Sequence, residues 1–122
     1  MYEINVDREH GVVEVELSGM MTLAEVSEYI SDLREAFVRN TLTNYSLLID
    51  VTRCPVQQQE VIQAMGVHMA TMPKARSIAL VTGSSLARMQ IRRLFTQSYS
   101  RIVGAIAEGR AWVIEGLEPA GL

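Results

Sequence analysis

A short apolar segment that leads directly into a helix-forming segment, within residues 75–95 (ARSIALVTGSSLARMQIRRLF), constrains this fold most strongly. Residues 77–81 are rich in Ile, Leu and Val and predict a buried strand, and residues 82–84 predict a turn. Ser84 or Ser85 is suited to the N-cap, because its hydroxyl can accept a hydrogen bond from an otherwise unpaired backbone N–H. A strand, a tight turn and an amphipathic helix in succession are typical of α/β folds.

Five segments have the apolar or alternating pattern of β-strands. They are residues 2–6, 12–17, 46–51, 77–81 and 102–107. The first two flank a polar turn and predict a hairpin, in which the alternation turns Glu14 and Glu16 toward water. A helix separates each later pair of strands, so these strands are expected to pair in parallel.

Four segments have helical spacing of apolar residues. One begins at Thr22 and carries a stripe through Phe37, and the others are residues 58–72, 85–99 and 110–115. The stripe of the first helix is predicted to be Leu23, Val26, Ile30, Leu33 and Phe37. Thr22 and Glu25 have the spacing of a capping box. The predicted fold is therefore α/β, with a single-layer, mixed, mostly parallel sheet, an N-terminal hairpin, packed helices and the order ββαβαβαβα.

The composition narrows the class of protein. The chain has 122 residues, 48% of them hydrophobic and 20% charged, which predicts one domain over residues 1–122 with a substantial core. A net charge of −3 argues against nucleic-acid binding, which needs a positive field. No apolar run approaches the ~20 residues that span a bilayer, and the N-terminal segment does not resemble a signal peptide. Cys54 is the single cysteine, so no internal disulfide forms, and the expected location is the cytoplasm.

Three segments, LSGMMTLAEVSEYISDL, SLLIDVTR and SIALVTGSSLARMQIRRLF, lie at strand-to-helix junctions or along a strand within this order. With the initial hairpin, they resemble the STAS domain, the fold of sulfate-transporter and anti-sigma-factor-antagonist domains, and in particular its SpoIIAA-like relatives. The resemblance covers nearly the whole chain. It implies a non-enzymatic regulatory or protein-interaction module in a bacterial protein, with a fold related to CRAL-TRIO lipid-binding domains.

The chain departs from that family at the turn that carries a phosphorylatable serine in regulatory members. The corresponding region here is DVTRCPVQQQEV, where Thr52 is the only hydroxyl between Asp50 and Glu60. Thr52 is too close to the strand end for a phosphate to act at the helix N-terminus. The predicted module therefore lacks the usual serine and meets an unknown protein partner through residues 52–59 and the following helix.

A small-molecule or lipid carrier is the alternative, with an apolar pocket under the second predicted helix. Methionines on that helix favour this hypothesis, because flexible thioethers suit adaptable pockets. The candidate residues for a ligand or partner surface are Asp50, Thr52, Arg53, Cys54, Ile62, Met65 and Met69. A separate candidate anion site at a helix N-terminus consists of Gly83, Ser84, Ser85 and Arg88.

An uncharacterised enzyme is the third hypothesis, and it requires Asp50, Cys54 or His68 to converge in one cleft. His68 is instead expected on the flank of its helix. No Cys or His pair has metal-ligand spacing, and no cofactor motif is evident, so neither a metal nor a cofactor is predicted. The N-terminal hairpin should lie at a sheet edge with unpaired backbone groups, which makes a homodimer a further expectation.

Overall fold

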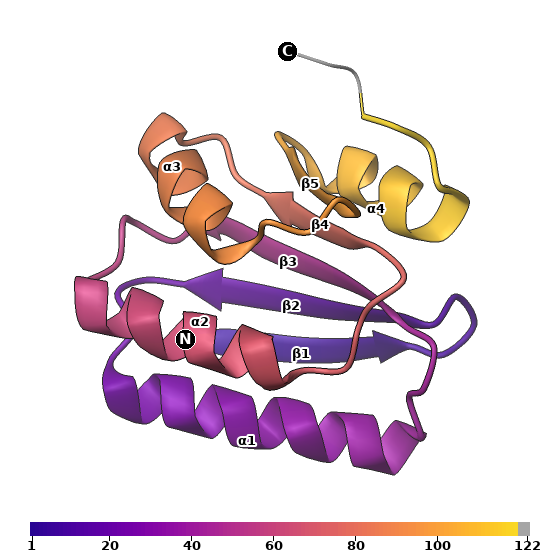
Figure 1. The fold of residues 1–122 in the computed structure, drawn as a ribbon, viewed down its shortest axis with the longest axis horizontal. Helices are drawn as coiled ribbons and strands as arrows, with labels where there is room; N and C mark the ends of the chain where they lie inside the picture. Colours follow the sequence, from indigo (N-terminus) through magenta and orange to yellow (C-terminus); the bar gives the residue numbers. More distant parts are fainter. Residues whose placement is uncertain (120–122) are drawn as a thin grey trace.

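The computed structural model describes residues 1–119 and contains one mixed sheet of five strands in the order β1-β2-β3-β4-β5 (Figure 1). The strands are β1 (Tyr2–Asp7), β2 (Val12–Ser18), β3 (Ser46–Arg53), β4 (Ile78–Val81) and β5 (Ser100–Val103). The predicted hairpin is confirmed, because β1 and β2 pair antiparallel, and all later neighbours pair in parallel, as expected. The last three residues of the predicted domain lie outside the described part of the chain.

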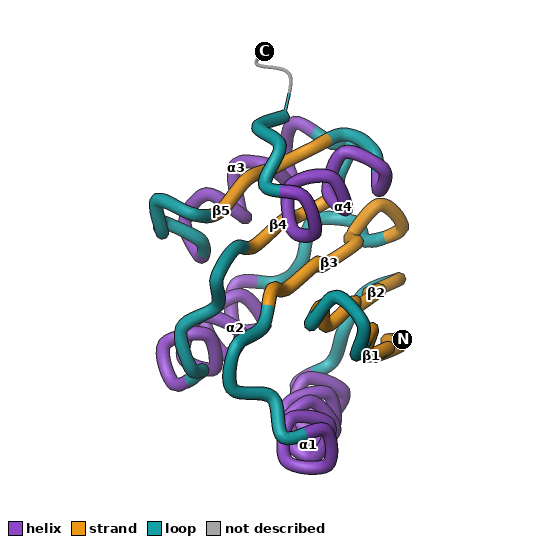
Figure 2. Tube along the Cα trace, turned by 90° about the vertical axis from the view of Figure 1, so that its right-hand side faces the viewer, coloured by secondary structure: helices purple, strands orange, loops and turns teal. Residues whose placement is uncertain are grey.

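Four helices connect and cover these strands: α1 (Leu23–Asn40), α2 (Gln59–Thr71), α3 (Ser85–Leu94) and α4 (Ile106–Glu115). Strands β2 to β5 follow one another across the sheet in chain order, so crossovers of one hand put α1, α2 and α3 on the same face. Helix α4 follows β5 and packs on the other face, against β3, β4 and β5 (Figure 1, Figure 2).

The sheet therefore separates two apolar cores of unequal size. The larger core lies under α1 to α3, and β2 supplies Val13, Val15 and Leu17 to it. Between these residues Glu14 and Glu16 turn to the opposite face, where Glu14 accepts two hydrogen bonds from Arg110 of α4 at 2.9 and 3.2 Å. The smaller core lies under α4 and consists of Val12, Leu48, Ala79, Val81, Val103 and Val113.

Helix α4 approaches the sheet closely at Gly109. A Cβ atom added there would lie 2.7 Å from Leu48 Cδ1 and 3.4 Å from Val81 Cγ2, so only glycine fits without a shift of its neighbours. Trp112 lies one turn further along, and its indole N–H is within 3.2 Å of the carbonyl oxygens of both Ile78 and Tyr99. These contacts fix α4 across strands β3, β4 and β5.

Two element boundaries differ from the prediction. Residues 102–107 do not form one strand, because β5 ends at Val103 and α4 already begins at Ile106. Helix α3 ends at Leu94 rather than at residue 99, and the polar residues 96–98 lie in the segment that returns the chain to β5. Apolar residues continue across the boundary between β5 and α4, which explains why the pattern alone extended that strand too far.

The start of α1 follows the prediction, and so does most of its buried stripe, because Val26 and Leu33 are buried and Ile30 and Phe37 pack against the larger core. Thr22 Oγ1 accepts a hydrogen bond from Glu25 N at 3.1 Å, and Glu25 Oε1 accepts one from Thr22 N at 3.4 Å. These two bonds confirm the capping box. Leu23, predicted to be buried, is 49% exposed, whereas Tyr29 is fully buried. Tyr29 joins the inner face of α1, where it packs edge-on between Tyr2 of β1 and His68 of α2.

Candidate functional site

An apolar cavity of about 90 Å³ lies between α2, α3 and the sheet face beneath them. Its floor is formed by alternate residues of the central strands, including Ile49 and Val51 of β3 and Leu80 of β4. Helix α2 contributes Ile62, Met65 and Met69, so these three candidate residues do line a pocket under the second helix.

Helix α2 is held above this cavity by its neighbouring helices, and it packs against α1 on one side and α3 on the other. Gly66 permits the contact with α3, since a Cβ atom there would lie 3.2 Å from Leu94 Cδ2. The first turn of α2 has no side-chain cap from Gln58. Helix α2 therefore depends on packing against its neighbours more than on its own terminus.

Gln57 closes the cavity at the carboxyl end of the strands. Its side-chain oxygen accepts from Met21 N at 2.8 Å, and its side-chain nitrogen donates to the carbonyl oxygens of Gly19 and Pro55 at 3.1 and 2.7 Å. Gln90 of α3 completes the connection, because its amide group bonds to both the backbone N–H and the carbonyl of Gln57, at 3.1 and 3.0 Å. Gln57 thereby connects the loop after β2, the loop after β3 and helix α3.

His68 lies on the inner face of α2 and not on its flank, so that prediction is wrong. Its side chain lines the cavity, and the residue is only 3% exposed. The imidazole meets the Tyr29 ring edge-on at 5.9 Å between ring centroids. Burial, together with the positive charge of Arg34, lowers the pKa of His68 below its usual value, so the ring is neutral at physiological pH.

The ring nitrogens of His68 have no hydrogen-bond partner. Among the described residues, Nδ1 and Nε2 of His68 are the buried side-chain polar atoms left without one. Arg34, the nearby cation, instead directs its guanidinium toward the Thr71 hydroxyl at 3.4 Å. The cavity therefore combines an apolar wall with one neutral, unpaired imidazole.

Cys54 also lines the cavity, and its thiol is not activated. The sulfur lies 3.5 Å from the carbonyl oxygen of Gly19, and burial raises the pKa of the Cys54 thiol above its usual value. A raised pKa keeps the sulfur protonated and weakens it as a nucleophile.

Asp50, Thr52 and Arg53 lie away from this cavity. Alternation along β3 sends Asp50 to the opposite face of the sheet, where the three residues line a shallow polar groove with Glu16. Asp50 Oδ1 accepts from Thr52 N at 3.0 Å, and Arg53 Nη1 lies 3.7 Å from Glu16 Oε1. The candidate surface residues therefore divide into two sites, and Asp50 does not meet Cys54 and His68 in one cleft.

The candidate anion site at the start of α3 is organised by helix capping. Ser84 is the N-cap, as one of the two predicted serines, and its hydroxyl accepts from Ala87 N at 3.2 Å. Ser84 N in turn donates to the Thr82 hydroxyl at 3.1 Å. Gly83 and Ser85 are exposed and Arg88 is half-buried. The Ala87 N–H, which an anion at this helix N-terminus would have used as a donor, is therefore engaged by the Ser84 hydroxyl.

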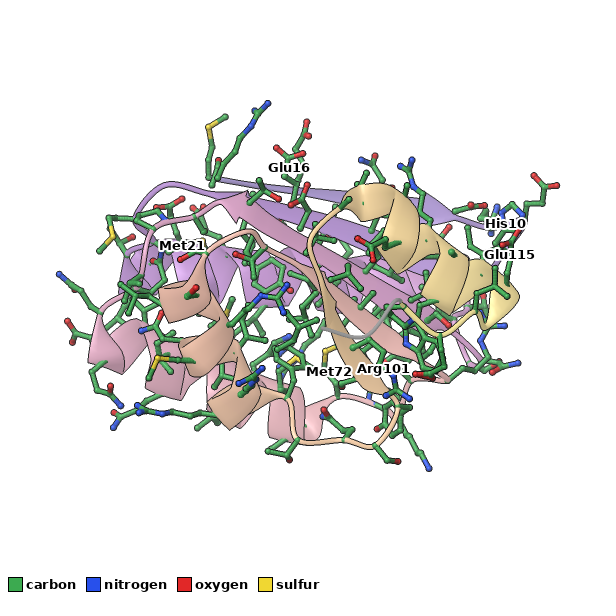
Figure 3. All side chains as sticks on the ribbon, turned by 90° about the horizontal axis from the view of Figure 1, so that it is seen from above. His10, Glu16, Met21, Met72, Arg101 and Glu115 are labelled. Carbon is green, nitrogen blue, oxygen red and sulfur yellow. The ribbon has the colours of Figure 1, made fainter. Side chains whose placement is uncertain are left out.

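The second histidine is far from the cavity. His10 belongs to the β1–β2 turn, at the opposite end of the molecule from Met21 of the cavity wall (Figure 3). Its Nδ1 lies 2.8 Å from Asp7 Oδ2, and that contact raises the pKa of His10. Glu9 brings a third ligand atom within 4.8 Å of these two, in a turn whose side chains face water.

Sequence reasoning missed three residues that define the cavity: Tyr29, Gln57 and Gln90. His68 could have been found, because Val61, Met65 and His68 follow the i, i+4, i+7 spacing of one helix face. No sequence signal distinguishes Gln57 from the glutamines that follow it, since its role depends on contacts with residues distant in the chain.

None of the helices within residues 1–119 combines the length and hydropathy required to cross a membrane. No protein-family model matches the chain, and no curated protein sequence matches it either.

Proposed function

We propose that this protein binds a small, mainly apolar molecule in the cavity beneath α2. The cavity itself carries the proposal: about 90 Å³ of space bounded almost entirely by apolar side chains. Protein interiors are normally packed without such voids. At roughly 24 cal/mol per Å³, an empty cavity of this size costs about 2 kcal/mol of folding free energy. A ligand that occupied it would recover the lost contacts.

The volume of about 90 Å³ is too small for a lipid, and a single ring requires the cavity to expand. Pockets for drug-sized molecules span about 300–1,000 Å³, whereas an engineered apolar cavity of about 150 Å³ binds benzene. Met65 and Met69 allow modest expansion, because each has three rotatable side-chain bonds and a polarizable sulfur. The small-molecule form of the carrier hypothesis is therefore preferred.

A STAS-like fold remains part of this proposal. The order of elements and the mixed sheet with its N-terminal hairpin support it. The proposed role is non-enzymatic, because the partly buried Cys54 thiol has a raised pKa and Asp50 lies on the opposite sheet face. The proposed protein is therefore a STAS-like regulatory module that binds its ligand in the cavity.

A protein-interaction surface is the second candidate function, and exposed apolar residues favour it. Met20, Val56, Leu86 and Met89 are exposed in the loops and helix that follow the carboxyl ends of β2, β3 and β4. A partner captured by the wild-type protein should be lost in Val56→Glu. It should be retained in Val38→Glu, which alters an exposed valine of α1. Equal capture by both variants would contradict an interface at residues 52–59.

The ligand-binding proposal is tested by measuring urea unfolding in the presence of toluene. A ligand at ten times its Kd should stabilise the native state by about 1.4 kcal/mol. Ala87→Leu fills the cavity from α3 and should abolish this gain. Ala107→Leu makes the same change at an exposed position of α4 and should retain it. No stabilisation of the wild-type protein by toluene would refute the proposal.

A further inference from the structure

We infer that His68 recognises the polar group of the ligand, and that the ligand is an uncharged ring compound with one hydroxyl group, of the phenol class. This inference rests on the proposed function, since it requires the cavity to be a binding site.

The imidazole of His68 is buried without a hydrogen-bond partner. Buried polar atoms in native proteins nearly always have a hydrogen-bond partner, and leaving one unpaired is costly. Neither Nδ1 nor Nε2 of His68 has a partner, and the residue is only 3% exposed. A neutral imidazole offers one N–H donor and one acceptor nitrogen, which a hydroxyl group can meet as acceptor or donor.

Water alone does not suit this position well. A buried water needs two to four polar partners. The other amide side chains in the wall, Gln57 and Gln90, are already bonded to backbone groups. Tyr29 and Cys54 also line the wall, and apolar side chains such as Ile62, Met65 and Leu80 provide most of the remaining surface. A molecule with an apolar body and one hydroxyl can pair with one His68 nitrogen while its body contacts the apolar side chains.

The charge of the site excludes acids. Burial and Arg34 keep the His68 ring neutral, and Arg34 itself is exposed on α1 and directed toward Thr71. The other ionisable groups in the wall are Tyr29 of α1 and Cys54 after β3, whose pKa values are both raised by burial. No side chain of the described wall therefore offers a charge to a carboxylate or phosphate, which would be buried without compensation.

An aromatic ring fits the surrounding side chains. The His68 ring already makes an edge-on contact with Tyr29, and Phe95 lines the cavity from the end of α3. Met65 and Met69 present sulfur atoms, which make favourable contacts with aromatic rings. Aromatic pairs prefer offset or edge-on arrangements that a ring-sized ligand could complete.

Toluene and phenol provide the test, because they differ only in a methyl or a hydroxyl group on one ring. We expect the wild-type protein at pH 7.5 to bind phenol roughly tenfold more tightly than toluene, measured as Kd from amide chemical-shift titrations. Benzoate, which is charged at this pH, should bind more weakly than either. In His68→Phe the preference for phenol should disappear while toluene still binds.

Each outcome separates the two proposals. Equal affinity for phenol and toluene in the wild-type protein would overturn the role of His68 but leave the ligand-binding cavity standing. Binding of neither compound would overturn the proposed function and this inference together. A preference for phenol that persists in His68→Phe and in His68→Leu would assign recognition to another group. The ratio of the Kd values for toluene and phenol is measured on the wild-type protein. The test therefore still stands if either variant fails to fold.

Discussion

Replacing His68 by leucine is expected to stabilise the ligand-free protein. The native ring has two buried nitrogens without partners, and one such unsatisfied group costs about 1–3 kcal/mol. Leucine removes these atoms and keeps an apolar side chain against Tyr29, with a packing mismatch of up to about 1.5 kcal/mol. Two such nitrogens cost at least about 2 kcal/mol, so the expected net gain in the free energy of unfolding is at least about 0.5 kcal/mol at pH 8.

The gain should increase as the pH falls. The pKa of His68 is lowered in the folded protein from an ordinary value of 6.5, so below pH 6.5 the unfolded chain binds a proton that the native state does not. The stability that depends on neutral His68 is therefore complete above pH 6.5 and is lost below it, by at most about 1.4 kcal/mol per pH unit. His68→Leu lacks this loss, so its advantage should be larger at pH 5.5 than at pH 8, by at most about 1.4 kcal/mol.

Equilibrium urea unfolding at the two pH values, followed by circular dichroism and by the fluorescence of Trp112, measures both effects. His10→Gln should be present in both proteins, because the His10 pKa is raised by Asp7. That pair contributes stability below pH 6.5 and loses it as the pH rises, which is the opposite sign. A leucine variant that is less stable at pH 8 and has the same pH dependence as its parent would refute the reasoning.

Three further changes have defined outcomes. Gly109→Ala should lower the free energy of unfolding by about 1 kcal/mol in urea titrations, because overpacking against Leu48 outweighs the gain of about 1 kcal/mol in helix propensity; a more stable variant would contradict the close approach. Gln57→Ala should accelerate hydrogen exchange at the Met21 amide and speed toluene dissociation in NMR line-shape analysis, and unchanged exchange would argue against its closing role. Thr22→Ala should cost about 1 kcal/mol in thermal or urea unfolding through loss of the N-cap, whereas a neutral effect would contradict the capping box.

The sequence predicted this fold best where local chemistry determines the structure. The capping box at Thr22 and the N-cap at Ser84 depend on hydroxyl groups next to the helix that they start, and both are confirmed. The boundary between β5 and α4 was misplaced, because apolar residues continue across it and Gly104 interrupts them only briefly. Pairing with β4 determines where the strand ends and the helix begins. The local sequence pattern carries no information about that pairing.

The candidate site was predicted in part for the same reason. Met65 and Met69 were found because helical periodicity puts them on the inner face of α2. Gln57 was not, since its hydrogen bonds reach Gly19 and Met21, nearly forty positions earlier in the chain. The role of Gln57 depends on tertiary contacts, because the loop that it bonds to is distant in the sequence.

Helix α4 has a consequence for how the protein is made. Within the described chain it is the element that covers the smaller core, and it leaves the ribosome after all five strands. A nascent chain that ends near Gly104 has the strands of the sheet but leaves Leu48, Ala79 and Val81 open on one side. Since domains form as synthesis proceeds, this apolar face remains exposed until α4 emerges. That interval is when a chaperone that holds apolar surfaces would matter most to the yield of folded protein.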